Sequence, residues 1–456
     1  MKKTHFLSFL LTLVLTMGLF AVPAAATSVD DMSILGTAAL LVDADHDEVL
    51  FEQAAHEKRY PASITKVMTG ILVIEAIDRG ELHLDQVITA SDTFSQGLSV
   101  YGSTQNIKAG EQMTVKDLLY CMLVASANEA CNILAEAVSG TQEAFVEQMN
   151  QRAAELGCTS THFANTHGLH DDDHYTTAYD IYLIFREGMK HELFRTIVGT
   201  DEYWVEPTNL SDQRHFFTTN FLLSAKKIPG YTYANATGGK TGSTDEAGHC
   251  LVSTAQKGDR HLIAVVMGAE NVRLEDGSLR REVFTESKRL LQWGFDNFSR
   301  QTLLEAGMPT QEVPVTLSKE AQHVVAVPAQ SLEATLPDDV TPDMFQKNIQ
   351  LPESVTAPVE EGQVLGTVTL SYDGKEYGTV ELVAQNSVAL STMLYRQQQI
   401  SEFLSNWWIK IVIAVVLLAA AILILRLTLF RRARRYGRSS YGGTKTRGYR
   451  GGRRRR

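Results

Sequence analysis

Hydrophobic positions follow two different patterns along the first 300 residues, one typical of strands and one typical of helices. Together they predict a domain of mixed strands and helices. Apolar runs at residues 37–42 and 48–52 flank a polar stretch, which predicts a β-hairpin. A second hairpin is predicted within residues 250–267, where a Gly-containing turn joins two strand-like runs. Between the hairpins, apolar positions recur every three or four residues, which indicates helices. The expected helices are residues 63–80, 114–123, 129–138, 145–156 and 179–190, with another at 281–298.

Strands at both ends of this region, with helices between them, predict one sheet built from segments far apart in the sequence. A helical subdomain should pack beside that sheet. Residues 301–385 have a different pattern, with short alternations of Val, Leu and Thr that predict a small all-β domain without catalytic residues. Residues 386–406 are expected to form a helical stalk.

Both ends of the chain carry membrane-related signals. Residues 1–26 combine Lys2 and Lys3, an apolar run and a final Ala24–Ala26, which is typical of a secretory signal peptide; a retained N-terminal anchor is the alternative. Residues 407–430 would form a helix about 36 Å long, enough to cross a bilayer. No polar residue occurs from 411 to 425, which argues against a helix lying in the membrane plane.

The charge is divided unevenly between the two sides of this predicted membrane helix. Thirteen Lys or Arg residues and no acid follow residue 410, so the positive-inside rule makes residues 431–456 a cytoplasmic tail. The net charge of −11 therefore conceals a body, without its signal peptide, near −27. This negative charge argues against nucleic-acid binding by the exported part. Anionic lipid is the nearest partner for the tail.

Metal and disulfide chemistry are weakly indicated. Four cysteines show no metal-ligand spacing, and a pairing of Cys121 with Cys131 stays open beside the interpretation that all four are buried thiols. A loop rich in His and Asp at residues 162–174 is interpreted as a solvated polar loop, because no helical His pair accompanies it. We expect no cofactor and no metal.

Three short motifs occur in order, and together they indicate nucleophilic catalysis. Ser63 and Lys66 are one helical turn apart at the start of a very apolar segment, where loss of hydration lowers the pKa of a lysine and makes it a base. Ser224 and Lys227 have the same spacing, but no Ser-x-Asn follows them. The other motifs are Ser126-Ala-Asn128 and Lys240-Thr241-Gly242-Ser243-Thr244.

At these motifs the chain resembles the penicillin-recognising serine enzymes. It is most similar to low-molecular-mass penicillin-binding proteins, the D-alanyl-D-alanine carboxypeptidases. The stretches 163–169 and 240–248 and the β-rich second domain share this resemblance. It implies an α+β catalytic domain of the β-lactamase/transpeptidase type, with an antiparallel sheet and a helical subdomain. The expected domains are a signal peptide 1–26, a catalytic domain 27–300, a β-rich domain 301–385, a stalk 386–406, a membrane helix 407–430 and a tail 431–456.

The resemblance also implies a role for each motif residue. Ser63 attacks the carbonyl, Lys66 takes its proton and Ser126 relays a proton to the leaving amine. Substrate binding falls to Asn128, Lys240, Thr241, Gly242, Ser243 and Thr244, with the backbone N–H groups of Ser63 and Ser243 as the oxyanion hole. Participation of Arg280 or Arg281 in carboxylate binding stays open.

The expected function is therefore removal of the terminal D-alanine from peptidoglycan stem peptides through an acyl-enzyme on Ser63 that β-lactams also form. Three alternatives remain: a D,D-endopeptidase acting on cross-links, a β-lactamase and a non-catalytic wall-binding protein. The β-lactamase is disfavoured because no Glu-x-x-Leu-Asn follows the Asn128 region. The catalytic domain should lie outside the cell, on the wall side.

Overall fold

The computed structural model describes the backbone of residues 32–436 and the side chains of residues 32–429. The predicted signal peptide and nearly all of the predicted tail therefore lie outside the described residues. The chain forms two compact units. The first contains everything described up to Leu303 and also Glu333–Met344, and the second contains Leu304–Leu332 and the chain from Phe345 onward.

A five-stranded antiparallel sheet forms the centre of the first unit, in the order β2-β1-β9-β8-β7. Both predicted hairpins are present, and the sheet joins them because β1 pairs with β9, with Leu41 opposite Ala264. Strand β7 lies at one edge. The strands are β1 Ala38–Asp43, β2 Glu48–Gln53, β7 Ala236–Thr244, β8 Gly248–Lys257 and β9 Arg260–Ala269.

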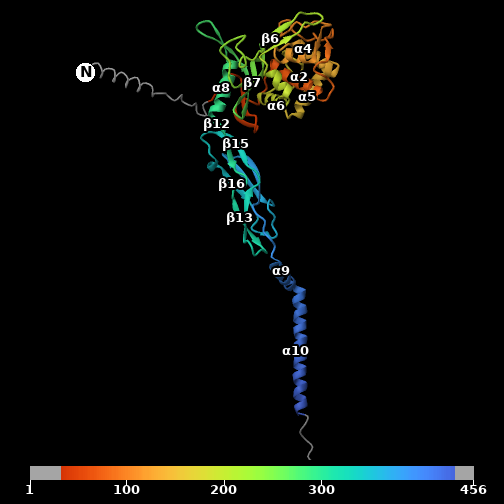
Figure 1. The fold of residues 1–456 in the computed structure, drawn as a ribbon, viewed down its shortest axis with the longest axis vertical. Helices are drawn as coiled ribbons and strands as arrows, with labels where there is room; N and C mark the ends of the chain where they lie inside the picture. Colours follow the sequence, from red (N-terminus) through yellow and green to blue (C-terminus); the bar gives the residue numbers. More distant parts are fainter. Residues whose placement is uncertain (1–31, 437–456) are drawn as a thin grey trace, which may run out of the picture. The chain divides into compact units, whose positions relative to one another are not determined.

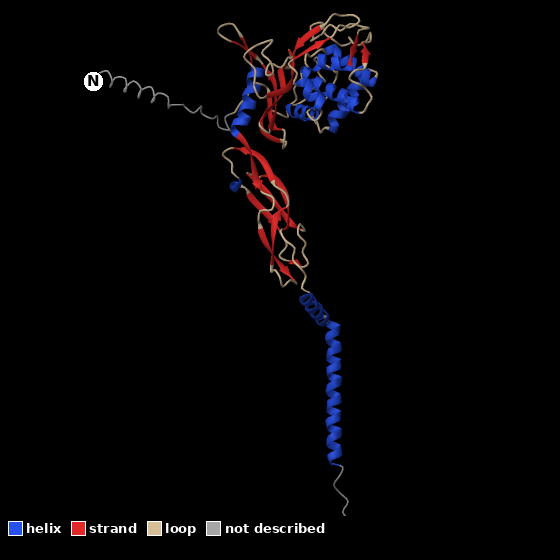
Figure 2. Ribbon diagram, viewed as in Figure 1, coloured by secondary structure: helices blue, strands red, loops and turns tan. Residues whose placement is uncertain are grey.

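Helices cover both faces of this sheet, as Figures 1 and 2 show. Because side chains alternate along a strand, Leu40 and Val42 of β1 face the core around α2 (Lys66–Asp78). Leu41 faces the opposite way and packs in the core that contains α8 (Glu282–Asn297). The prediction of a mixed fold with a helical subdomain beside one sheet is confirmed.

The helical subdomain surrounds α2, which is buried on all sides as its apolar sequence predicts. Thr114 caps the next helix, and its Oγ1 accepts a hydrogen bond from the backbone N–H of Asp117 at 3.0 Å. The remaining helices are α3 Val115–Leu123, α4 Asn128–Ser139, α5 Gln142–Glu155, α6 Ala178–Gly188 and α7 Glu192–Val198.

Several short elements of this unit were not predicted. Helix α7 has only seven residues, and the strand pairs are three or four residues long, too short for a periodic pattern. These pairs are β3 Val87–Thr89 with β4 Gln112–Thr114, β5 Glu202–Val205 with β6 Arg214–Phe217, and β10 Asn271–Arg273 with β11 Leu279–Arg281. In addition, β12 (Phe298–Leu304) pairs with β15 (Leu332–Pro337).

The second unit contains an all-β part followed by two helices. Its six-stranded sheet has the order β16-β18-β19-β14-β13-β17. Those strands are β13 Gln311–Thr316, β14 His323–Pro328, β16 Gln346–Gln350, β17 Val355–Thr356, β18 Val364–Tyr372 and β19 Lys375–Ala384. Helix α9 (Thr392–Ser405) follows, and α10 (Trp407–Tyr436) is long and apolar enough over Trp407–Leu429 to cross a membrane.

Candidate active site

Ser63 does not belong to the helix that contains Lys66. It lies in η2, a 3₁₀ helix over Ala62–Thr65 that leads directly into α2, so the two side chains still project from neighbouring turns. The preceding Ala62 has φ = 47°, a left-handed conformation that a non-glycine residue adopts only when its surroundings enforce it. The backbone at the predicted nucleophile is therefore held in place by contacts with other parts of the fold.

Lys66 is fully buried, and its amine reaches three acceptors. Nζ lies 2.8 Å from Ser63 Oγ, 2.7 Å from Asn128 Oδ1 and 2.6 Å from the carbonyl oxygen of His167. Burial lowers the pKa of Lys66 to about 8, and the negative potential from Cys131 and Glu129 opposes this shift only in part. The first two motifs therefore meet at one buried amine.

Lys240 forms a second lysine–serine contact, with Ser126. Its Nζ donates to Ser126 Oγ at 2.9 Å and to the carbonyl oxygen of Thr241 at 2.8 Å. Burial lowers the pKa of Lys240 well below its usual value, and the positive charge of Lys66 lowers it further. Ser126 has φ = 66° in the short connection between α3 and α4, which turns its hydroxyl towards β7.

Strand β7 approaches the serine closely enough to require glycine at one position. A Cβ on Gly242 would lie 2.7 Å from the carbonyl oxygen of Pro61 and 3.1 Å from the backbone nitrogen of Ile64. The third motif is thus packed directly on the turn that carries Ser63. Thr241 Oγ1 donates to Thr219 Oγ1 at 2.6 Å, and Ser243 Oγ lies 3.0 Å from His249 Nδ1.

An open cleft of about 810 Å³ begins at Ser63. One wall contains Asn128 and the connection from Gly97 to Ser103, and another contains the end of β7 at Ser243 and Thr244. Tyr101 stands at this cleft with 96% of its surface exposed. Each of the three motifs therefore contributes to this cleft, through Ser63, Asn128, and Ser243 with Thr244, whereas Ser126, Lys240 and Thr241 are not among its lining residues.

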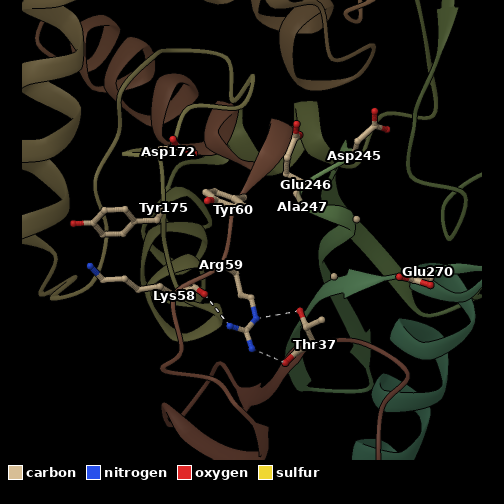
Figure 3. A pocket seen from close by; sticks show the side chains of 12 residues that line it. Thr37, Lys58, Arg59, Tyr60, Asp172, Tyr175, Asp245, Glu246, Ala247 and Glu270 are labelled. Atoms are coloured by element: carbon tan, nitrogen blue, oxygen red, sulfur yellow. Dashed lines mark hydrogen bonds between the residues drawn. The ribbon is translucent and has the colours of Figure 1, made fainter.

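A second cavity of about 480 Å³ borders this cleft at the turn after β7, and Asp245 and Glu246 line both. Figure 3 shows the Arg59 guanidinium turned to Thr37, with hydrogen bonds of 3.1 Å to Thr37 Oγ1 and 2.8 Å to the carbonyl of Lys58. The guanidinium group of Arg59 therefore already hydrogen-bonds to neighbouring protein atoms. No motif residue is among those that line this cavity in the described chain.

The interpretation of residues 162–174 as a solvated loop was wrong for two of its histidines. His167 and His174 are 3% and 2% exposed, and burial lowers their pKa values to about 3 and about 4. The same loop supplies Gly168, where a Cβ would lie only 1.9 Å from the carbonyl oxygen of Ala62. This loop therefore closes on the serine turn, a contact that no spacing in the sequence indicates.

Neither of two further candidates, a metal site and a disulfide bond, is part of the cleft. In the described part of the chain, one group of ligand atoms is close enough to hold a metal, formed by Glu75, Glu187 and His191. Arg152 already neutralises both carboxylates, at 2.7 Å and 2.9 Å. All four cysteines are free and buried, so the pairing of Cys121 with Cys131 does not occur.

The remaining candidates from the sequence have contacts of their own, and whether Arg280 or Arg281 binds a carboxylate stays open. Ser224 and Lys227 lie outside any helix, and Ser224 Oγ accepts from the backbone N–H of Lys226 at 3.3 Å. Arg280 is paired with Glu282 at 2.5 Å. Arg281 lies over the ring of Phe221, 5.8 Å from its centroid.

Two family models match the chain. Residues 25–271 match the D-alanyl-D-alanine carboxypeptidases of peptidase family S11, and residues 298–390 match the C-terminal domain of penicillin-binding protein 5. The D-alanyl-D-alanine carboxypeptidase DacF of Bacillus subtilis is 32% identical over 353 residues, which covers 77% of this chain and 84% of that protein. DacC of Escherichia coli is 32% identical over 372 residues, with 80% and 87% covered.

Solved structures agree with these sequence matches. Penicillin-binding protein 5 of Haemophilus influenzae matches with a TM-score of 0.60 and 29% identity, over 78% of this chain and 98% of that chain. The D-alanyl-D-alanine carboxypeptidase DacD of Francisella tularensis matches with a TM-score of 0.61 and 26% identity, over 79% and 95%. The fold is that of a transpeptidase-like penicillin-binding protein with an all-β second domain.

The chain belongs to the peptidase S11 family of D-alanyl-D-alanine carboxypeptidases. The predictions of family, fold class and carboxypeptidase function are confirmed, and the alternative functions are not favoured.

Proposed function

We propose that the chain cleaves D-alanyl-D-alanine peptides by a serine mechanism, with Ser63 as the nucleophile and Lys66 as its general base. The observation that carries this proposal is the contact of 2.8 Å between Nζ of the fully buried Lys66 and Oγ of Ser63, which lines the open cleft. A base must be neutral to accept a proton, and a pKa of about 8 leaves roughly a tenth of the lysine neutral at pH 7.

The other contacts of Lys66 direct its lone pair to the serine. Neutral Lys66 has two hydrogens, and the two acceptors that cannot themselves donate are Asn128 Oδ1 and the His167 carbonyl oxygen. When they take both hydrogens, the lone pair is left for the hydroxyl hydrogen of Ser63. Ser63 Oγ then attacks the carbonyl carbon of the penultimate D-alanine as its proton moves to Lys66.

The second contact pair supports departure of the leaving group. The Ser126 hydroxyl, which accepts a hydrogen bond from Lys240 Nζ at 2.9 Å, would give a proton to the amine of the departing D-alanine and take up in its place the proton that Lys66 removed from Ser63. This step breaks the peptide bond and leaves an ester on Ser63, which water then hydrolyses. Lys240 also contributes positive potential on the side where the substrate carboxylate binds.

Carboxylate and oxyanion binding fall to β7. Thr241 and Thr244 would bind the terminal carboxylate, and the backbone N–H groups of Ser63 and Ser243 would bind the developing oxyanion. The close packing of Gly242 against the serine turn supports this, because it brings the β7 backbone beside Ser63. Capture of a carboxylate explains why such a site would act at the C-terminus of a peptide.

The proposed substrates are peptidoglycan stem peptides that end in D-Ala-D-Ala, and β-lactams would acylate the same serine. Full-length protein in detergent should release D-alanine from such a peptide, and its penicillin adduct should last for hours. Absence of release beside an active relative would reject the proposal. An adduct lifetime of milliseconds would instead favour a β-lactamase.

We also propose an orientation at the membrane. Helix α10 would span it once, with residues 27–406 on the wall side and 431–456 in the cytoplasm, and the β-rich domain 301–385 would act as a spacer. The cationic residues after α10 support this orientation, since each contributes about 1 kcal/mol near anionic lipid. Protease added to protoplasts should digest the catalytic domain and spare a C-terminal epitope. Loss of that epitope would contradict the orientation.

A further inference from the structure

The left-handed turn at Ala62 is stabilised by one hydroxyl group. Thr65 Oγ1 donates to the carbonyl oxygen of Ala62 at 2.8 Å, and both residues are buried. Ala62 immediately precedes Ser63, so its φ of 47° determines the direction of the Ser63 backbone N–H and side chain. Such a conformation costs on the order of 1–3 kcal/mol and persists only where contacts oppose relaxation.

The hydrogen of Thr65 determines which atom donates in the next contact. Thr65 Oγ1 lies 2.7 Å from His174 Nε2. Because its only hydrogen is directed to Ala62, Thr65 must accept here, and His174 Nε2 must carry a hydrogen. The other ring nitrogen, Nδ1, accepts from the backbone N–H of Ala164 at 3.0 Å. The imidazole is therefore neutral, with its single hydrogen on Nε2.

The ring of His174 is fixed on several sides. The Phe163 ring packs edge-on against the His174 ring, with the ring centroids 5.7 Å apart. The backbone N–H of His174 donates to the carbonyl oxygen of Asp171 at 3.0 Å. Through Ala164 the ring also holds the start of the loop that contains His167, whose carbonyl oxygen accepts from Lys66. His174 thus joins the two segments that place the nucleophile and its base.

We propose that His174 is a positioning residue for acylation, which fixes Thr65 and through it the backbone at Ser63. His174 would touch neither the substrate nor Ser63, and it belongs to none of the three sequence motifs. This inference rests on the proposed acyl-enzyme at Ser63, because the rate of that step is what His174 would control.

The test uses two pairs of variants in the full-length protein. His174→Leu removes both hydrogen bonds, whereas His174→Gln can keep an N–H donor and an oxygen acceptor. Thr65→Val removes the hydroxyl at nearly constant volume, whereas Thr65→Ser keeps it. His162→Leu is the control, since His162 is exposed in the same segment, and its ring lies by the carbonyl of Asp173 and the ring of Tyr175 rather than by Thr65.

The readout is the acylation rate at saturating fluorescent penicillin, measured beside the melting temperature. His174→Leu and Thr65→Val should each slow acylation up to about 100-fold, the cost of a small displacement of a reacting group. The two losses should not add in the double variant, because both act through one contact. His174→Gln, Thr65→Ser and the control should acylate much faster.

The outcomes separate this inference from the proposed function. A wild-type protein that forms no adduct rejects the proposed function. Adduct formation at the same rate in folded wild type and His174→Leu, or additive losses in the double variant, rejects only the role of His174. If His174→Leu does not fold, equal acylation rates for Thr65→Val and Thr65→Ser overturn the inference.

Discussion

Asn128 Oδ1 accepts a hydrogen bond from Lys66 Nζ at 2.7 Å, across 62 residues of sequence. The contact joins the start of α4 to the start of α2 and lies between two buried side chains. It gives the amide a role besides the substrate binding expected of it, because Asn128 Oδ1 takes one of the two hydrogens of neutral Lys66. The geometry thus directs the lysine lone pair before any substrate arrives.

Replacement of Lys66 by Arg should abolish useful acylation. A guanidinium stays protonated at all accessible pH values, so the base is lost while the charge remains. We expect acylation by penicillin to slow by at least about 10³-fold, within the range assigned to a positioned general base. Lys227→Ala is the control and should react like wild type. Rapid acylation of Lys66→Arg would exclude Lys66 as the base.

The acylation rate should rise with pH up to about 8. The pKa of Lys66 is lowered to about 8 by burial, and only the neutral amine accepts the proton of Ser63. Below this pH the neutral fraction falls about tenfold for each pH unit. Stopped-flow acylation between pH 6 and 9 measures this profile. A flat profile, or a rate that declines as pH rises through this range, is incompatible with the proposed base.

Two glycines with similar positive φ angles should respond very differently to replacement by alanine. Gly168 has φ = 86°, and its added Cβ would lie 1.9 Å from Ala62 O. Gly140 has φ = 80° and open space around its added Cβ. Gly140→Ala should cost on the order of 1–3 kcal/mol in unfolding free energy, because alanine rarely adopts φ = 80° with ψ = −33°, and should acylate normally. Gly168→Ala should lose acylation or fail to fold; normal acylation would mean that the loop does not hold the serine turn.

Mild acid should destabilise the folded state through two buried histidines. Burial holds the pKa of His174 at about 4 and that of His167 at about 3, below the 6.5 of an exposed histidine. Below pH 6.5 the unfolded chain therefore binds more protons than the folded chain, so the unfolding free energy falls as pH falls. The window from pH 6.5 to 5 lies above the usual carboxyl pKa values.

Melting temperatures across that window give the measurement. His174→Gln cannot titrate, so its melting temperature should depend less steeply on pH than that of wild type. An unchanged slope would show that His174 is not the neutral buried group that its contacts indicate.

The sequence predicted what depends on long patterns and on ordered motifs. The apolar segment after Lys66 predicted a central buried helix, and the two hairpins predicted strands that meet in one sheet. Ser63, Lys66, Ser126 and Lys240 come together because α2, α4 and β7 converge. Motif order was informative because such sites need several residue types from different elements.

The features that were not predicted depend on tertiary contacts, which produce no periodic pattern in the sequence. His174 and Gly168 lie in an irregular loop rich in polar residues, which resembles an exposed loop until its packing on Ala62 is known. Loss of hydration was predicted to lower the pKa of Lys66, and burial is indeed its main cause, whereas the repulsion between the two lysines lowers the pKa of Lys240. The degree of burial comes from tertiary packing, which residue spacing does not give.

The proposed mechanism depends most directly on Ser63 as the acylated residue. Full-length protein should be labelled with fluorescent penicillin, digested and analysed by mass spectrometry, in parallel with Ser63→Ala and Ser224→Ala. We predict one adduct on the peptide that contains Ser63, absent from Ser63→Ala and retained in Ser224→Ala. D-alanine release should follow the same pattern. An adduct on another peptide, or D-alanine release by Ser63→Ala at the wild-type rate, would contradict the account.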